Sequence, residues 1–92
     1  MRDRASEMIS VVIKSMDADL AKRLAAVCIS KGSVTLHVDK VSKILRSKGI
    51  DIMPNDLSDA CSGNLPVPGY GSGEVFEHLT GLNYYQDASY YR

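Results

Sequence analysis

Hydrophobic positions near the start of the chain repeat with the period of an α-helix. Six residues fall at i, i+3, i+4, i+7, i+8 and i+11: Ala5, Met8, Ile9, Val12, Ile13 and Met16. This spacing puts them on one stripe of a 3.6-residue helix. It predicts an amphipathic helix over residues 4–16, within an N-terminal segment 1–18.

The same periodicity predicts a second helix directly afterwards. Asp17 or Asp19 can cap its start, because a carboxylate accepts hydrogen bonds from the free N–H groups of the first turn. Apolar residues then recur at helical spacing: Leu20, Leu24, Val27 and Cys28. This helix is expected to end near Ile29.

A turn and a third helix follow. Residues 30–33 form the turn, and residues 34–38 alternate apolar and polar positions, which predicts two or three extended residues. Val41, Ile44 and Leu45 return to helical spacing until Gly49 supplies a C-terminal stop.

Two shorter helices are predicted in the rest of the chain. Asn55 or Asp56 can cap one that ends near Cys61, and the last starts near Glu74. Residues 63–73 contain two prolines and four glycines and are expected to lack regular structure. Residues 83–92 form a tail with four of the five tyrosines. The predicted fold is therefore all-α.

The net charge of zero hides an uneven distribution of charged residues. Residues 1–48 carry ten of the eleven Lys and Arg residues against five acids. Residues 49–92 carry six acids and only Arg92. Such polarity can steer an oppositely charged partner, or attract the two halves of one fold to each other. The second explanation is the simpler one.

The sequence offers little for catalysis, metals or membranes. Its Cys and His residues, Cys28, His37, Cys61 and His78, have spacings that match no zinc motif. Both cysteines fall on apolar helix faces, where thiols are usually inert. The longest apolar run, residues 11–13, is too short for a signal peptide or a membrane span. We expect a cytoplasmic protein that is not an enzyme, with no metal, no cofactor and no membrane partner.

Several short stretches resemble the EF-hand superfamily. Residues 31–35, 43–49 and 55–57 are similar to the first loop, exit helix and next entering helix of an EF-hand pair. Residues 75–82 are similar to the exit helix of the second hand in calmodulin and myosin light chains. The resemblance implies a pair of degenerate EF-hand helix-loop-helix units over residues 19–82. The N-terminal helix is extra to such a lobe: it packs across the lobe, lies against the partner or leads to a second lobe.

Neither loop has the ligands that calcium requires. With Glu77 at position 12, Gly71 stands at position 6, but positions 1, 3 and 5 are Pro66, Pro68 and Tyr70. With Gly32 at position 6 of the first loop, positions 1, 3, 5 and 12 hold Val27, Ile29, Lys31 and Val38. The resemblance therefore implies a calcium-independent lobe, as in some myosin light chains.

In such a lobe, the two loops pair through short strands and the four helices enclose a groove. Here Val34 or Leu36 would pair with the residues just before Val75. The groove would receive a basic amphipathic helix of a larger protein, such as the IQ motif of a myosin heavy chain. Ten residues are expected to line it: Met16, Leu24, Val27, Ile44, Leu45, Met53, Leu57, Phe76, Leu79 and Leu82. Each of them is also compatible with an ordinary core position.

Two other functions are open alternatives. Residues 34–51 are also similar to the N-terminal helical dimerisation domain of acidic ribosomal stalk proteins, although the acidic tail of that family is missing here. A small helix-turn-helix nucleic-acid binder would use the basic helix face of Lys40, Lys43, Arg46 and Lys48. With no interleaved aromatic residues, a solvated helix face is the preferred interpretation, and nucleic acid is not an expected partner.

Overall fold

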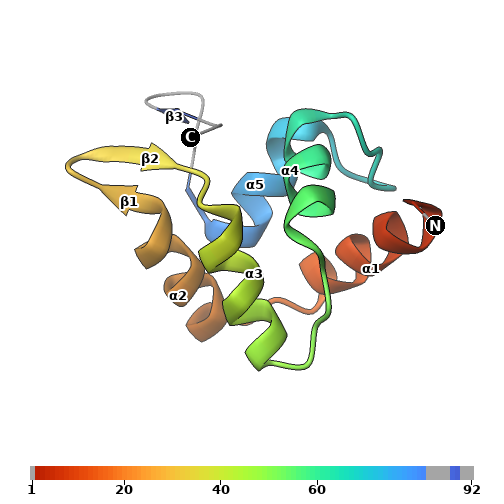
Figure 1. The fold of residues 1–92 in the computed structure, drawn as a ribbon, viewed down its shortest axis with the longest axis horizontal. Helices are drawn as coiled ribbons and strands as arrows, with labels where there is room; N and C mark the ends of the chain where they lie inside the picture. Colours follow the sequence, from red (N-terminus) through yellow and green to blue (C-terminus); the bar gives the residue numbers. More distant parts are fainter. Residues whose placement is uncertain (1, 83–87, 90–92) are drawn as a thin grey trace.

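The computed structural model describes residues 2–82 and 88–89, and this part of the chain is predominantly α-helical (Figure 1). The helices are α1 (Arg2–Lys14), α2 (Ala18–Cys28), α3 (Val38–Ser47), α4 (Pro54–Ser62) and α5 (Ser72–Thr80). Three short strands add a small sheet: β1 (Ile29–Ser30), β2 (Ser33–Thr35) and β3 (Ala88–Ser89). The four tyrosines of the predicted tail lie outside the described residues.

The helices lie where the apolar periodicity predicts them, and their ends follow local chemistry. The Leu20 N–H donates to Asp17 Oδ1 over 2.7 Å, which identifies Asp17 as the cap of α2. The capping prediction for α4 is wrong, because this helix starts at Pro54, directly after Met53. Proline suits a first helical position, where its missing N–H would have no partner within the helix.

The small sheet corrects the predicted strand pairing. Val34 on β2 pairs antiparallel with Ile29 on β1, and parallel with Ala88 on β3. The residues just before Val75 belong to α5 instead. Lys31 and Gly32 both adopt positive φ, 52° and 80°. This backbone suits a tight hairpin turn, so the extended residues pair within the α2–α3 connection.

The connection between α4 and α5 is a folded loop packed against α1. It contains no helix, although α5 begins at Ser72, two residues inside the loop predicted over residues 63–73. Leu65 and Val67 in this connection are only 3% and 5% exposed. Ser6 Oγ donates to the carbonyl oxygen of Pro66, and Ser10 Oγ donates to that of Pro68. Apolar burial and hydrogen bonds from α1 therefore hold this loop in place.

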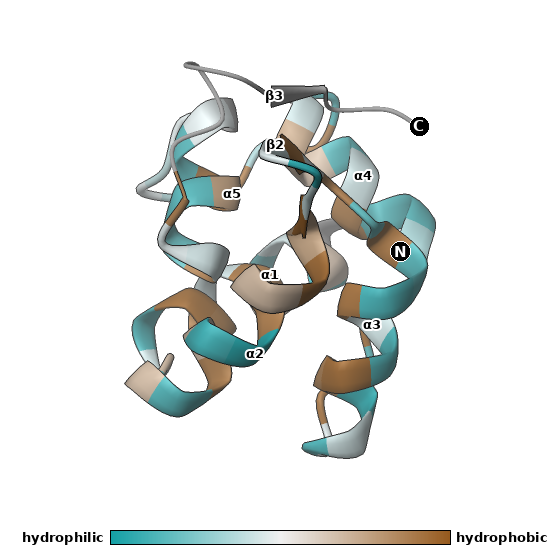
Figure 2. Cartoon of the chain, turned by 90° about the vertical axis from the view of Figure 1, so that its left-hand side faces the viewer, coloured by the Kyte–Doolittle hydropathy of each residue, from teal (hydrophilic) through white to brown (hydrophobic). Residues whose placement is uncertain are grey.

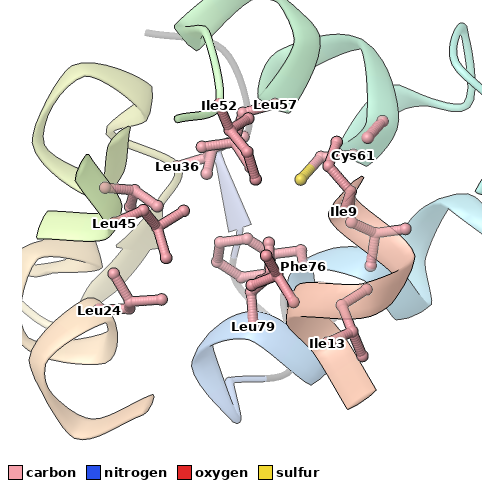
Figure 3. Close-up of a cluster of buried hydrophobic side chains, with 14 of the residues drawn as sticks. Ile9, Ile13, Leu24, Leu36, Leu45, Ile52, Leu57, Cys61, Phe76 and Leu79 are labelled. Carbon is pink, nitrogen blue, oxygen red and sulfur yellow. The ribbon is translucent and has the colours of Figure 1, made fainter. Parts of the chain in front are cut away.

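One hydrophobic core joins all five helices, and Phe76 lies near its centre (Figure 3). Ile9 and Ile13 reach it from α1, Leu24 from α2 and Cys61 from α4. Of the three placements considered for the N-terminal helix, α1 thus packs across the rest of the fold, against α4 and α5.

Candidate functional site

The residues predicted to line a groove separate into two groups in the structure. Five of them are 0–1% exposed and belong to the closed core: Leu24, Leu45, Leu57, Phe76 and Leu79. A partner helix could contact these side chains only after the helices had moved apart.

The other five predicted groove residues lie outside the fully buried core. Four are partly buried and pack against the core: Met16, Val27, Ile44 and Leu82. Met53 is 55% exposed, just before α4. The structure therefore brings half of the predicted site together as core and leaves the rest at its margins.

A different apolar surface lies over α1. Val11 is 63% exposed, the largest fraction among the exposed large hydrophobic residues in the described part of the chain. An open pocket of about 310 Å³ is lined by Arg4, Glu7, Met8 and Val11. The helical spacing of these residues places them on one side of α1. We call this pocket, together with the adjoining one described next, the α1 surface.

The second pocket extends the α1 surface toward the start of α4. It has a volume of about 260 Å³ and is lined by Arg4, Ala5, Met8, Asp51 and Asp56. Asp56 lies in the first turn of α4, where a carboxylate is favoured by the helix dipole. Across both pockets, three carboxylates face a single Arg4, so the α1 surface combines apolar contacts with net negative charge.

The sequence contained one signal for this site. Val11 falls outside the predicted apolar stripe of residues 4–16, so an amphipathic helix leaves it on the solvent side. The contribution of Asp51 and Asp56 depends on how α4 packs against α1, which the local pattern does not encode.

The two cysteines are held in their protonated form. Both are fully buried, on α2 and α4. Burial, with a smaller contribution from the nearby Cys28, raises the pKa of Cys61 to about 12. Burial also raises the pKa of Cys28, partly opposed by a hydrogen bond from the His37 main chain. Thiols in this state are poor nucleophiles.

The two histidines serve different parts of the fold. His78 on α5 lies edge-on to Tyr70, with ring centroids 4.9 Å apart, and so braces the loop before α5. His37 precedes α3 and is partly buried. Within the described residues, no group of three or more His, Cys, Asp or Glu side chains is arranged to hold a metal ion. Among the same residues, no helix has the length and apolar character needed to cross a membrane.

Comparison with known protein families, curated proteins and solved structures finds no match to this chain. The α1 surface is therefore interpreted from its own chemistry.

Proposed function

We propose that this protein is a calcium-independent binding subunit for a basic amphipathic helix of a larger protein, with an IQ-type helix of a myosin neck as the model partner. The observation that carries the proposal is the combination on the α1 surface of exposed Val11 and half-buried Met8 with three carboxylates.

Apolar side chains spaced three and four residues apart on the partner would cover Val11 and Met8. Helix recognition of this kind buries such anchors in an apolar depression, and flexible Met side chains adapt well to them. The 63% exposure of Val11 leaves most of that side chain available for burial.

The acidic residues supply the preference for a basic partner. Glu7 and Asp51 are exposed, and Asp56 is partly buried beside them. Lys or Arg residues flanking the apolar anchors would lie close to these carboxylates. Complementary charge of this kind speeds association and selects the partner more than it adds affinity.

The order of the helices is the feature that this chain shares with EF-hand light chains. The order helix, connection, helix occurs twice in residues 18–80, as α2–α3 and α4–α5, and this order is shared with an EF-hand pair, although β2 pairs with β1 and β3 rather than with the second connection. The proposed mode of binding differs from that of an open lobe, because the partner occupies the outside of α1 and leaves the core closed.

The test is a calorimetric titration of the full chain with an amphipathic peptide that carries Leu and Ile on one face and Lys and Arg on the other. We expect a Kd of roughly 1–100 μM, equal with calcium and with a chelator. Val11→Asn should weaken binding at least about tenfold, a loss of ~1.4 kcal/mol. Ile29→Asn is the matched control, because Ile29 is 50% exposed on the β1–β2 hairpin rather than on the α1 surface.

Three results would contradict the proposal. The first is no binding of the basic peptide, and the second is equal affinity of the Val11→Asn variant. The third is a stable homodimer in sedimentation that Val11→Asn dissociates, because this would assign the α1 surface to self-association, as in a stalk-type dimerisation module.

A further inference from the structure

A second charged surface lies on the elements between residues 18 and 49, and it meets the α1 surface where Arg46 approaches Asp51. All seven Lys and Arg side chains of this segment are exposed: Lys22, Arg23, Lys31, Lys40, Lys43, Arg46 and Lys48. Its only acids, Asp19 and Asp39, lie in the first turns of α2 and α3. Helices α2 and α3 contact each other, and Figure 2 shows them side by side beneath the hairpin. We call the exposed side of α3 together with the hairpin tip the basic surface.

An ion pair joins the two halves of the charge distribution, between Arg46 on the basic surface and Asp51 on the α1 surface. Arg46 Nε lies 3.9 Å from Asp51 Oδ1. These side chains are 54% and 79% exposed, and a pair so long and so exposed adds little stability. The basic surface and the acidic side of the α1 surface therefore meet at this pair, while the other cations of the basic surface remain exposed.

The cations of α3 are arranged in a line. Lys40, Lys43 and Arg46 are spaced three residues apart and extend about 9 Å along one side of the helix. An α-helix about 10–12 Å in diameter fits the major groove of duplex DNA, which is about 12 Å wide. Lys31 adds a further cation at the tip of the hairpin, just before α3 in the chain.

The surroundings of these cations argue against two other anionic partners. Val38 and Ile44 pack against the core, and Val41 and Leu45 are buried in it, so α3 has no free apolar stripe to insert into a lipid surface. Residues 18–49 also contain no Phe, Tyr or Trp on which unpaired bases could stack.

We infer that the basic surface binds the phosphate backbone of duplex nucleic acid, without reading its sequence. Lys40, Lys43 and Arg46 contact successive phosphates, and Lys31 at the hairpin tip reaches a neighbouring part of the backbone. Binding of this type is driven by the release of condensed counterions and weakens steeply with salt.

The test is fluorescence anisotropy of a labelled 20-base-pair duplex titrated with the full chain at several salt concentrations. Three phosphate contacts predict that log K falls with log salt with a slope of about −2.7 or steeper. Lys40→Gln, Lys43→Gln and Arg46→Gln combined should flatten this slope by about 2–3 and weaken binding more than about tenfold at low salt. All three side chains are exposed, so the variant should keep the fold, which circular dichroism checks.

The controls separate this inference from the function proposed above. Lys14→Gln removes a cation at the end of α1, outside the basic surface, and should lower the affinity far less than the triple variant. Val11→Asn should bind the duplex normally, because the α1 surface takes no part. Absence of salt-dependent binding at about 100 μM protein would overturn the inference, as would undiminished binding by the triple variant. Tighter binding to phosphatidylserine vesicles than to duplex would assign the surface to a membrane and overturn it as well.

Discussion

The Ser10 hydroxyl donates a hydrogen bond to the main-chain carbonyl oxygen of Pro68 over 3.3 Å and so ties α1 to the loop before α5. Ser6, one turn earlier, makes the same type of bond to Pro66. Both serines are buried, at 8% and 5% exposure, beside the apolar stripe of α1. Helix α1 thus organises a segment some sixty residues away in the chain.

Replacing both serines should measure how much these two hydrogen bonds contribute to the free energy of unfolding. A typical hydrogen bond contributes about 0.5–1.5 kcal/mol, so Ser6→Ala with Ser10→Ala should lower the free energy of unfolding by about 1–3 kcal/mol. Urea denaturation gives this quantity. Ser47→Ala is the control, because Ser47 is exposed and bonds only to Ile44 within its own helix. Equal losses in the two variants would show that the link to the loop contributes nothing.

Phe76 provides a test of whether the centre of the molecule is core or open groove. It is 0% exposed, and Figure 3 shows the ring surrounded by side chains from several elements. Phe76→Ala should therefore cost about 3–5 kcal/mol of unfolding free energy, whereas Phe76→Leu should cost clearly less because it leaves a smaller cavity. A stability change near zero for Phe76→Ala, combined with loss of peptide binding, would place the ring in an open groove.

The sequence predicts the helices well because their buried faces repeat at helical spacing. Leu20, Leu24 and Cys28 are all buried, as their stripe on α2 requires. The same pattern cannot distinguish a closed core from a groove, because both use apolar side chains. Leu45 and Leu57 were therefore equally compatible with both, and only packing between helices shows them to be buried.

The parts that the local pattern did not predict depend on long-range contacts. Proline and glycine in residues 63–73 predict the absence of a helix, but burial of Val67 depends on α1 lying against the loop. Likewise, the pairing of Val34 with Ile29 depends on the turn at Lys31, a residue type that rarely adopts positive φ. The acidic side of the α1 surface arises only when Asp51 and Asp56 are brought to Arg4 by tertiary packing.

Two neighbouring positions on α1 allow a matched comparison of core and surface. Ile9 is 0% exposed and Val11 is 63% exposed on the same helix. Ile9→Ala should lower the free energy of unfolding by about 2–5 kcal/mol, because it opens a cavity in the core. Val11→Ala should change it by less than about 0.5 kcal/mol. Similar effects of the two substitutions in chemical denaturation would contradict the packing of α1 across the fold.

The buried thiols make a prediction about alkaline pH. In the unfolded chain a cysteine has its ordinary pKa of 9.0, whereas burial in the folded state raises the pKa of Cys61 to about 12. Between these pH values the folded state retains a proton that the unfolded state releases. The contribution of the protonated Cys61 thiol to the free energy of unfolding is therefore fully present below pH 9 and is lost as the pH rises toward 12. The expected loss is about 1.4 kcal/mol per pH unit for each thiol that stays protonated only in the folded state. The free energy of unfolding in urea, measured between pH 8 and 10.5, should thus decline more steeply for the natural chain than for Cys61→Ala, which lacks this thiol. Parallel declines would show that Cys61 titrates as freely in the folded chain as in the unfolded one.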